Sequence, residues 1–170
     1  ARNTVEALMA WEDAGVQELF VRAGVMSTLE QESRIHVRHE QYVKTLQIEA
    51  QVLREMAETQ ILPVLLEDLQ NKAKSVSRLE SLGIARPEQI RRTIESESTQ
   101  IDEAYKRLGS LRGALAQADS VEELHARTTA FAQLVLPACQ SLRESLDALE
   151  DQCDTRLWPL PKYRELLAPL

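Results

Sequence analysis

Apolar residues recur every three or four positions over most of this chain, which is the spacing of one buried helix face. The longest series covers residues 42–79. Before it, residues 27–30 form a capping box, in which the Ser27 hydroxyl accepts from the Glu30 N–H and the Glu30 carboxylate reaches back. Gly83, which tolerates positive φ, follows the series. We therefore predict one very long helix over about residues 27–82, roughly 80 Å in length.

Two prolines interrupt the apolar series without ending them. Pro63 lies inside the long helix, and Pro137 lies inside a later helical series. A proline removes one backbone donor and its ring clashes with the preceding turn, so it kinks a helix that continues on both sides. We expect a kink near Thr59 in the long helix and a second one at Pro137.

The remaining pattern divides the chain into helices and connecting segments. Residues 1–26 form a linker with one short helix near 14–22, which Gly24 ends. Pro87 opens a second long helix over about 87–118, and a second capping box at 120–123 opens a third over about 120–157. Residues 158–170 form an irregular Trp-Pro-x-Pro tail with a short turn at 163–168. The predicted fold is all-α: an elongated antiparallel three-helix bundle of coiled-coil type over 27–157.

The three predicted long helices differ in length, so the first extends beyond the other two. Its residues 28–48 still carry apolar side chains, and an apolar surface of this kind needs a partner. We predict that this segment docks on another domain or subunit. The residues assigned to the docking surface are Arg34, Ile35, Tyr42, Lys44, Leu46, Ile48 and Glu49.

Composition supports a helical protein and narrows its partners. Aromatic residues make up 4%, with five Gly and six Pro in 170 residues, which is too few for a sheet protein. The net charge of −7 has no basic cluster, so nucleic acid is not an expected partner. No apolar run is long enough to span a membrane and no signal peptide opens the chain, so we expect a cytoplasmic protein. The chain opens on Ala1 rather than Met, which suggests part of a longer protein.

The two cysteines are interpreted as buried thiols. Cys139 and Cys153 lie 14 positions apart on the third predicted helix. That separation is about 21 Å at 1.5 Å per residue, which is too long for a disulfide. Two unbridged thiols are typical of a reducing compartment.

Two short patterns offer metal ligands. His36 and His39 lie at i, i+3 on the long helix, with Glu32 nearby as a third ligand. Glu122 and His125 form a single E-x-x-H match, but di-iron bundles need two copies and further carboxylates. Polar residues at a contact surface and acids in a first helical turn explain both patterns more simply. We therefore assign no metal ligand, no cofactor site and no catalytic residue; glycine loops for phosphate and activated nucleophiles are also missing.

Several strings resemble the C-terminal part of type III glutamine synthetases. Residues 2–8 (RNTVEAL) resemble the stretch that leaves the catalytic domain, and residues 29–34 (LEQESR) resemble the start of a long helix. Residues 42–50 (YVKTLQIEA) are similar to a Y-x-K-T-I-N-I-E-A segment, 61–63 (ILP) to I-L-P-A, and 158–163 (WPLPKY) to a W-P-x-P-x-Y terminus. Ile35 stands in place of an expected Tyr, and Leu46-Gln47 replaces Ile-Asn.

The resemblance implies that the parent is an ATP-dependent glutamate–ammonia ligase that uses Mg²⁺ or Mn²⁺ and assembles as a large homo-oligomer. The motifs for glutamate, ATP and metal would precede Ala1, so this fragment is not catalytic on its own. It would serve as a C-terminal structural and assembly domain, with the parent's catalytic domain as its partner.

Two other functions remain open at this point. One is a stand-alone helical interaction or dimerisation module that uses the docking surface. The other is a metal-dependent bundle protein with His36, His39 and Glu32 as ligands.

Overall fold

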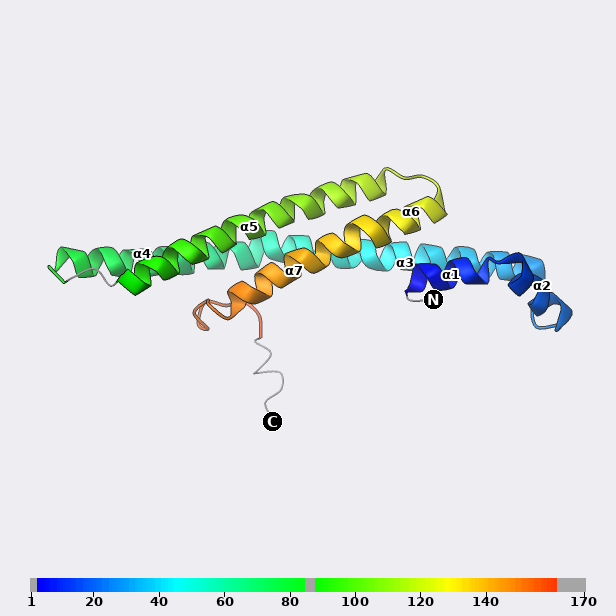
Figure 1. The fold of residues 1–170 in the computed structure, drawn as a ribbon, viewed down its shortest axis with the longest axis horizontal. Helices are drawn as coiled ribbons and strands as arrows, with labels where there is room; N and C mark the ends of the chain where they lie inside the picture. Colours follow the sequence, from blue (N-terminus) through cyan, green and yellow to red (C-terminus); the bar gives the residue numbers. More distant parts are fainter. Residues whose placement is uncertain (1–2, 85–87, 162–170) are drawn as a thin grey trace, which may run out of the picture. The chain divides into compact units, whose positions relative to one another are not determined.

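The computed structural model describes residues 3–84 and 88–161, and within them the chain forms helices joined by turns, with no strand (Figure 1). This confirms the predicted all-α class. None of the helices in these two ranges is long and apolar enough to cross a membrane. The elements in chain order are α1 (Thr4–Trp11), α2 (Ala14–Arg22), α3 (Thr28–Met56), the π-helix η1 (Ala57–Ile61), α4 (Leu62–Ser81), α5 (Glu88–Asp119), α6 (Leu124–Ala130), the π-helix η2 (Phe131–Val135) and α7 (Leu136–Glu150).

The chain divides into two compact units. Unit 1 comprises Ala1–Gln51 and Arg112–Ala138, and unit 2 comprises Val52–Leu111 and Cys139–Leu170. Helices α3, α5 and α7 each contribute residues to both units. Each unit has its own buried apolar residues.

The segment before the long helix contains two helices, where the sequence pattern predicted only one. Asn3 caps the unexpected α1, because its side chain accepts from the backbone N–H of Glu6 at 2.8 Å. Asp13 caps α2 by accepting from the N–H groups of Gly15 and Val16. An Asn followed three residues later by Glu is a helix-start signal, and the prediction overlooked it.

Two glycines end helices as predicted. Gly24 has φ of +65° and Gly83 has φ of +73°. After α2, the N–H of Val25 donates to the carbonyl of Phe20, and after α4 the N–H of Ile84 donates to that of Leu79. Each is the long bond of a Schellman motif, in which a left-handed residue turns the chain back onto the last helical carbonyls.

The predicted long helix is present and begins at the predicted capping box. The Ser27 N–H donates to a Glu30 carboxylate oxygen at 2.8 Å, and the Glu30 N–H donates to the Ser27 hydroxyl at 3.3 Å. The hydrogen bonds from Ser27 lower the pKa of Glu30. From Thr28 to Ser81 the backbone is helical at every residue, with η1 between α3 and α4.

A π-helical segment precedes each of the two helix prolines. Leu62 donates to the carbonyl of Ala57, and Leu136 donates to that of Phe131, each an i→i−5 bond. Pro63 and Pro137 directly follow these donors. A proline cannot donate to the carbonyl four residues earlier, and a wider turn before it accommodates the missing bond. The kink at each proline stays a prediction; what the structure shows is a π-helical turn.

The third predicted helix begins and ends at different residues than expected. The capping box at 120–123 is wrong: α6 begins at Leu124, and its cap is Glu123, whose carboxylate accepts from the N–H groups of His125 and Ala126. These bonds lower the pKa of Glu123. The Ser120 hydroxyl instead donates to the carbonyl of Gln117 near the end of α5, so it does not cap α6.

The predicted continuation to residue 157 is also wrong, because α7 ends at Glu150. Cys153 is therefore beyond the helix, where it is buried, while Cys139 on α7 is only half-buried. The chain then makes turns up to residue 161. The remaining tail, with the predicted turn at 163–168, and Pro87 at the predicted start of the second helix lie outside the described residues.

In unit 2, contacts between side chains give the directions of the helices. Lys72 on α4 donates to Glu97 on α5, and Arg107 on α5 donates to the carbonyl of Ser141 on α7. Further toward the start of α5, Gln100 accepts from Gln152, which follows α7. As residue numbers rise on α5 they fall on α7, so these two helices are antiparallel. The contacts are consistent with the predicted bundle.

We predict opposite effects for alanine at two glycines. Gly109 lies on the exposed side of α5, and a Cβ there would have no atom within 4 Å, so Gly109→Ala should raise the free energy of unfolding by roughly 0.5–1 kcal/mol. Gly83 is equally uncrowded but has φ of +73°, so Gly83→Ala should lower it by roughly 1 kcal/mol. Urea unfolding followed by circular dichroism measures both; equal effects of the same sign would contradict the backbone assignment.

Candidate functional site

The residues assigned to a docking surface on α3 do not all face outward. Arg34, Lys44, Ile48 and Glu49 are exposed, and Tyr42 and Leu46 are half-buried. Burial raises the pKa of Tyr42. Ile35, however, is only 4% exposed and belongs to the core of unit 1, so it cannot contribute to a docking surface. Docking by the other six residues stays a prediction.

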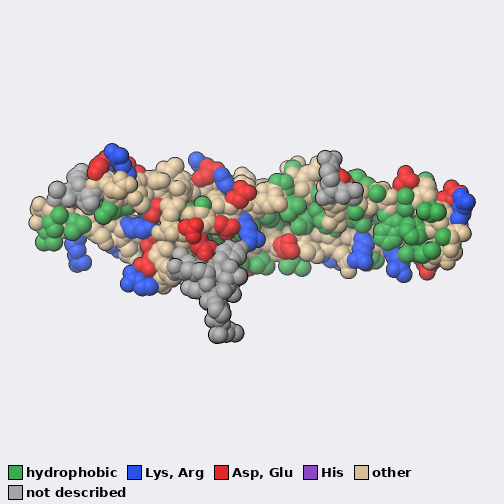
Figure 2. Space-filling model, turned by 60° about the horizontal axis from the view of Figure 1, so that its bottom comes forward, with side chains coloured by type: hydrophobic (Ala, Val, Ile, Leu, Met, Phe, Trp, Pro, Cys, Tyr) green, Lys and Arg blue, Asp and Glu red, His purple; other side chains and the backbone are tan. Residues whose placement is uncertain are grey.

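Unit 1 also exposes apolar side chains that the sequence analysis did not single out. Figure 2 shows hydrophobic side chains gathered where α1 and α2 lie. These helices and the turn after them carry the exposed residues Met9, Leu19, Val21 and Val25. On α3, Ile48 is 61% exposed. The first two helices of the chain therefore expose apolar surface of their own.

The structure does not join the metal ligands that the sequence offered on α3. His36 is exposed and its Nε2 lies 3.6 Å from a carboxylate oxygen of Glu40, one turn along the helix. Glu32 is exposed as well. His39 points into unit 1 and is 1% exposed. A site made of His36, His39 and Glu32 is therefore not formed.

His39 instead belongs to a cluster with Glu12 and His125. Its Nε2 lies 2.9 Å from Glu12 Oε1, and His125 Nδ1 lies 3.1 Å from the same oxygen. The two imidazole rings are 4.4 Å apart between centroids, tilted by 42°. The ligand atoms of all three residues lie within 4.8 Å of one another, and no other group of three or more such residues occurs in the described ranges.

A fourth residue completes the surroundings of the buried imidazole. Thr128 is fully buried on α6, and its Oγ1 lies 3.0 Å from His39 Nδ1. The same hydroxyl lies 2.8 Å from the carbonyl oxygen of Leu124, to which it donates. Both ring nitrogens of His39 thus have polar partners, one from the end of α1 and one from α6.

The cluster could not be found from sequence spacing. Glu12 is the residue that follows α1, His39 is in the middle of α3, and His125 is in the first turn of α6. The E-x-x-H pattern did include His125, but its neighbour Glu122 is not in the cluster. The carboxylate that meets His125 precedes it by more than a hundred residues, and only the packing of α1, α3 and α6 brings the two together.

Unit 2 contains a different polar cluster, built around Lys72. Its Nζ lies 2.8 Å from Asp68 Oδ2 and 2.6 Å from Glu97 Oε1, and it also donates to the carbonyl of Gln152 at 3.0 Å. Asp68 and Glu97 are both nearly buried. Burial opposes the charge on Lys72, but the hydrogen bonds and charges of the two carboxylates outweigh it and raise the Lys72 pKa.

The Lys72 cluster holds helices together and leaves little space for a ligand. The cavity beside it, lined by Asp68, Glu97, Gln152 and Cys153 with three apolar residues, measures about 10 Å³. That is about the space of one water molecule. The cluster therefore works as an ion-paired connection between α4, α5 and the turn after α7.

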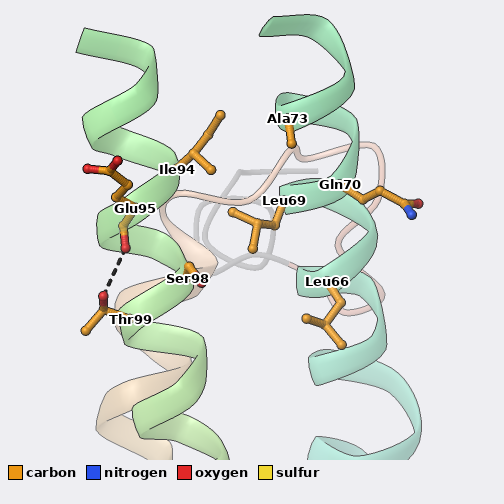
Figure 3. Close-up of a pocket in the computed structure, with 8 residues that line it drawn as sticks. All are labelled: Leu66, Leu69, Gln70, Ala73, Ile94, Glu95, Ser98 and Thr99. Carbon is orange, nitrogen blue, oxygen red and sulfur yellow. Dashed lines mark hydrogen bonds between the residues drawn. The ribbon is translucent and has the colours of Figure 1, made fainter. Parts of the chain in front are cut away.

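Unit 2 also has a groove between α4 and α5 (Figure 3). Leu69 and Ile94 point toward each other across it, while Gln70 points away. Of its eight lining residues only Glu95 is titratable. Thr99 uses its hydroxyl to donate to the carbonyl of Glu95 within α5. The groove thus offers an apolar contact surface and no group arranged for catalysis.

Comparison with known proteins finds similarity to glutamine synthetases. Residues 1–80 match the family model described as the glutamine synthetase C-terminal domain. The chain is 26% identical over 167 residues to a glutamine synthetase of Bacteroides fragilis (strain YCH46), and 28% identical over 174 residues to a type-3 glutamine synthetase of Dictyostelium discoideum. The chain is therefore similar to glutamine synthetases, and its first 80 residues to their C-terminal domain. The resemblance noted on separate strings thus extends to nearly the whole sequence.

These matches cover unequal shares of the proteins compared. They include 95% and 97% of this chain, but only 23% of either relative. The chain therefore spans about a quarter of the length of the curated relatives that it matches.

Removal of the central ammonium of unit 2 should destabilise this domain strongly. Lys72→Met leaves two buried carboxylates without a cation, so we expect the free energy of unfolding to fall by roughly 3 kcal/mol. The triple variant Lys72→Met, Asp68→Asn, Glu97→Gln should recover much of that loss, because no charge is left buried. Urea unfolding of both variants measures the difference; a triple variant no more stable than Lys72→Met would contradict a charge-based role.

The contribution of Lys72 should also depend on pH with a defined sign. Its folded pKa is raised above the ordinary value of 10.5, so its stabilising effect is fully present below that value and is lost as the pH rises through the raised pKa. The stability difference between the wild type and Lys72→Met should therefore be constant from pH 7 to about 10 and shrink at higher pH. A difference that shrinks between pH 7 and 9 would contradict this assignment.

Proposed function

We propose that this chain is the C-terminal structural and assembly domain of a type III glutamine synthetase. One observation carries the proposal: almost the whole chain aligns with two glutamine synthetases, yet it accounts for only 23% of each. The Dictyostelium relative, which bears the name type-3, supports the assignment to type III.

The activity proposed for the whole protein is the ATP-dependent joining of glutamate and ammonia. Phosphate transfer from ATP would form γ-glutamyl phosphate, and ammonia would then displace the phosphate. Mg²⁺ or Mn²⁺ would neutralise the charges on the transferred phosphoryl group. The residues for these steps belong, in this proposal, to the parent's catalytic domain, and none is assigned to residues 1–170.

The proposed role of this domain is to hold the catalytic domain and to contribute to subunit contacts in a cytoplasmic homo-oligomer. A helical segment that continues from Thr28 to Ser81 supplies a stiff support. Its exposed apolar side chains, among them Leu29, Val37, Ile48 and Val52, suit contact with another protein surface. Nucleic acid and membrane are not proposed as partners.

The test uses the full-length protein. Purified parent with the complete chain should form glutamine from glutamate, ammonia and ATP, and it should elute from size exclusion as a large oligomer. A parent truncated before residue 1 of this chain should lose the large oligomer. A full-length parent without ATP-dependent glutamine formation would reject the proposed activity, and a truncated parent with unchanged assembly would reject the proposed role.

A single substitution on the docking surface gives a sharper test. Ile48→Arg in the full-length protein should reduce the oligomeric fraction at least about tenfold at a given concentration, because it places a charge in an apolar contact. Leu82→Arg is the matched control: Leu82 is 72% exposed and lies outside the predicted surface, so the oligomer should persist. Equal effects of the two variants, or none from Ile48→Arg, would remove residue 48 from the interface.

A further inference from the structure

In the Glu12–His39–His125 cluster of unit 1, the side chains around His39 do not supply a hydrogen for every polar contact. Thr128 has one hydroxyl hydrogen and two neighbours, the carbonyl oxygen of Leu124 at 2.8 Å and His39 Nδ1 at 3.0 Å. A carbonyl oxygen can only accept, so the hydroxyl hydrogen belongs in the first contact. The opposite arrangement would leave two oxygens 2.8 Å apart with no hydrogen between them.

It follows that His39 carries a hydrogen on Nδ1 and donates it to Thr128. In a neutral imidazole the other nitrogen, Nε2, then has a lone pair. That lone pair would face the Glu12 carboxylate oxygen at 2.9 Å, and the two would repel each other. A positive centre is therefore required at Nε2, either a second proton or a metal ion.

The surroundings favour a metal ion over a proton. His39 is 1% exposed, and an imidazolium that deep loses most of its hydration. His125 Nδ1 lies 3.1 Å from the same Glu12 oxygen, so two imidazole nitrogens and one carboxylate oxygen lie within 4.8 Å of one another. Two nitrogen donors and one oxygen donor are a ligand set that zinc and similar divalent transition metals take in proteins.

The spacing of the donors is close to that of a metal site. Zinc bonds of about 2.0–2.1 Å in a tetrahedron separate the donor atoms by about 3.3–3.4 Å. The two measured separations from Glu12 Oε1 are 2.9 and 3.1 Å, and the third pair lies within 4.8 Å. The spacing of a metal site requires small shifts of Glu12 and of His125, whose side chains are 27% and 52% exposed and not locked in a core.

The support around the donors also has the form that metal sites use. A histidine ligand normally donates its second ring N–H to a fixed acceptor, which sets its orientation and tautomer. Thr128 is such an acceptor for His39, and the bond to Leu124 fixes Thr128 in turn. His125 is about half exposed, which leaves a path for the ion and room for a water molecule at a fourth position.

We propose that Glu12 Oε1, His39 Nε2 and His125 Nδ1 bind one divalent transition-metal ion of the zinc class. The ion joins the end of α1 to α3 and to the first turn of α6, three segments that are distant in sequence. Its role is to fix these helices within unit 1. The proposal does not depend on the activity of the parent protein.

The test uses the 170-residue chain without a histidine tag, treated with a chelator and titrated with Zn²⁺ by calorimetry. We expect one Zn²⁺ per chain and a higher midpoint of thermal unfolding. Glu12→Gln and His125→Asn, both at partly exposed positions, should keep the helical circular dichroism signal and bind at least about tenfold more weakly. His36→Asn, which alters an exposed histidine outside the cluster, should bind like the wild type.

Two outcomes would overturn the proposal. One is that the folded wild-type chain binds no stoichiometric Zn²⁺, which would mean that a proton, and not a metal ion, lies between His39 Nε2 and Glu12. The other is that Glu12→Gln and His125→Asn bind as tightly as His36→Asn, which would place the ion elsewhere. Absorption spectra with Co²⁺ in place of Zn²⁺ distinguish the proposed site from binding at the cysteines. A thiolate ligand from Cys139 or Cys153 would add a charge-transfer band that two imidazoles and a carboxylate cannot give.

The hydrogen bond from His39 to Thr128 can be tested separately, by Zn²⁺ binding of Thr128 variants. Thr128→Val removes the acceptor for His39 Nδ1 and should weaken Zn²⁺ binding by about tenfold or more, while Thr128→Ser should restore it. The comparison is made on variants with the same urea midpoint without metal. Serine that fails to restore binding in a folded chain would contradict the assigned hydrogen bond.

Discussion

One helical segment without interruption, from Thr28 to Ser81, supplies buried side chains to both units, and the rest of the structure depends on it. In unit 1 it buries Ile35, Val43 and Ala50, and in unit 2 it buries Ile61 and Leu65. A helix can bury only part of its circumference, so within each unit this segment buries one stripe and exposes the rest. The capping box at Ser27 sets the start of the helical segment, and the Schellman motif at Gly83 sets its end.

Each of the two cores contains buried polar groups, and the groups in the two cores have different kinds of partner. In unit 2, the carboxylates of Asp68 and Glu97 share the ammonium of Lys72, so opposite charges satisfy one another. In unit 1, His39 meets a hydroxyl on one ring nitrogen and a carboxylate on the other. The carboxylates of unit 2 are neutralised by Lys72 without any added ion. In the proposal for unit 1, a positive ion lies between the lone pair of His39 and the Glu12 carboxylate. This contrast is the physical basis for placing a metal in unit 1 and none in unit 2.

The similarity to known proteins and the geometry of the helices describe different properties of the molecule. Relatives named glutamine synthetase align with 95% and 97% of the chain, and the chain spans 23% of each. The groove between α4 and α5 is lined mainly by apolar and neutral polar residues, and the cavity at Lys72 measures about 10 Å³. The prolines add a further local feature: π-helical turns before Pro63 and Pro137 keep each helix continuous where a backbone donor is missing.

The sequence by itself determined the helical class and the long helix, with its start at Ser27 and its end at Gly83, because caps, glycine turns and apolar spacing act over a few residues. It failed for α1, where the cap at Asn3 was overlooked, and at residue 120, where two local signals competed and Glu123 was the better cap. Tertiary structure alone decided that Ile35 is buried and that His39 meets Glu12 and His125 and not His36. The reason is that a helix fixes which residues share a face, whereas the residues that meet that face come from helices whose positions no local pattern encodes.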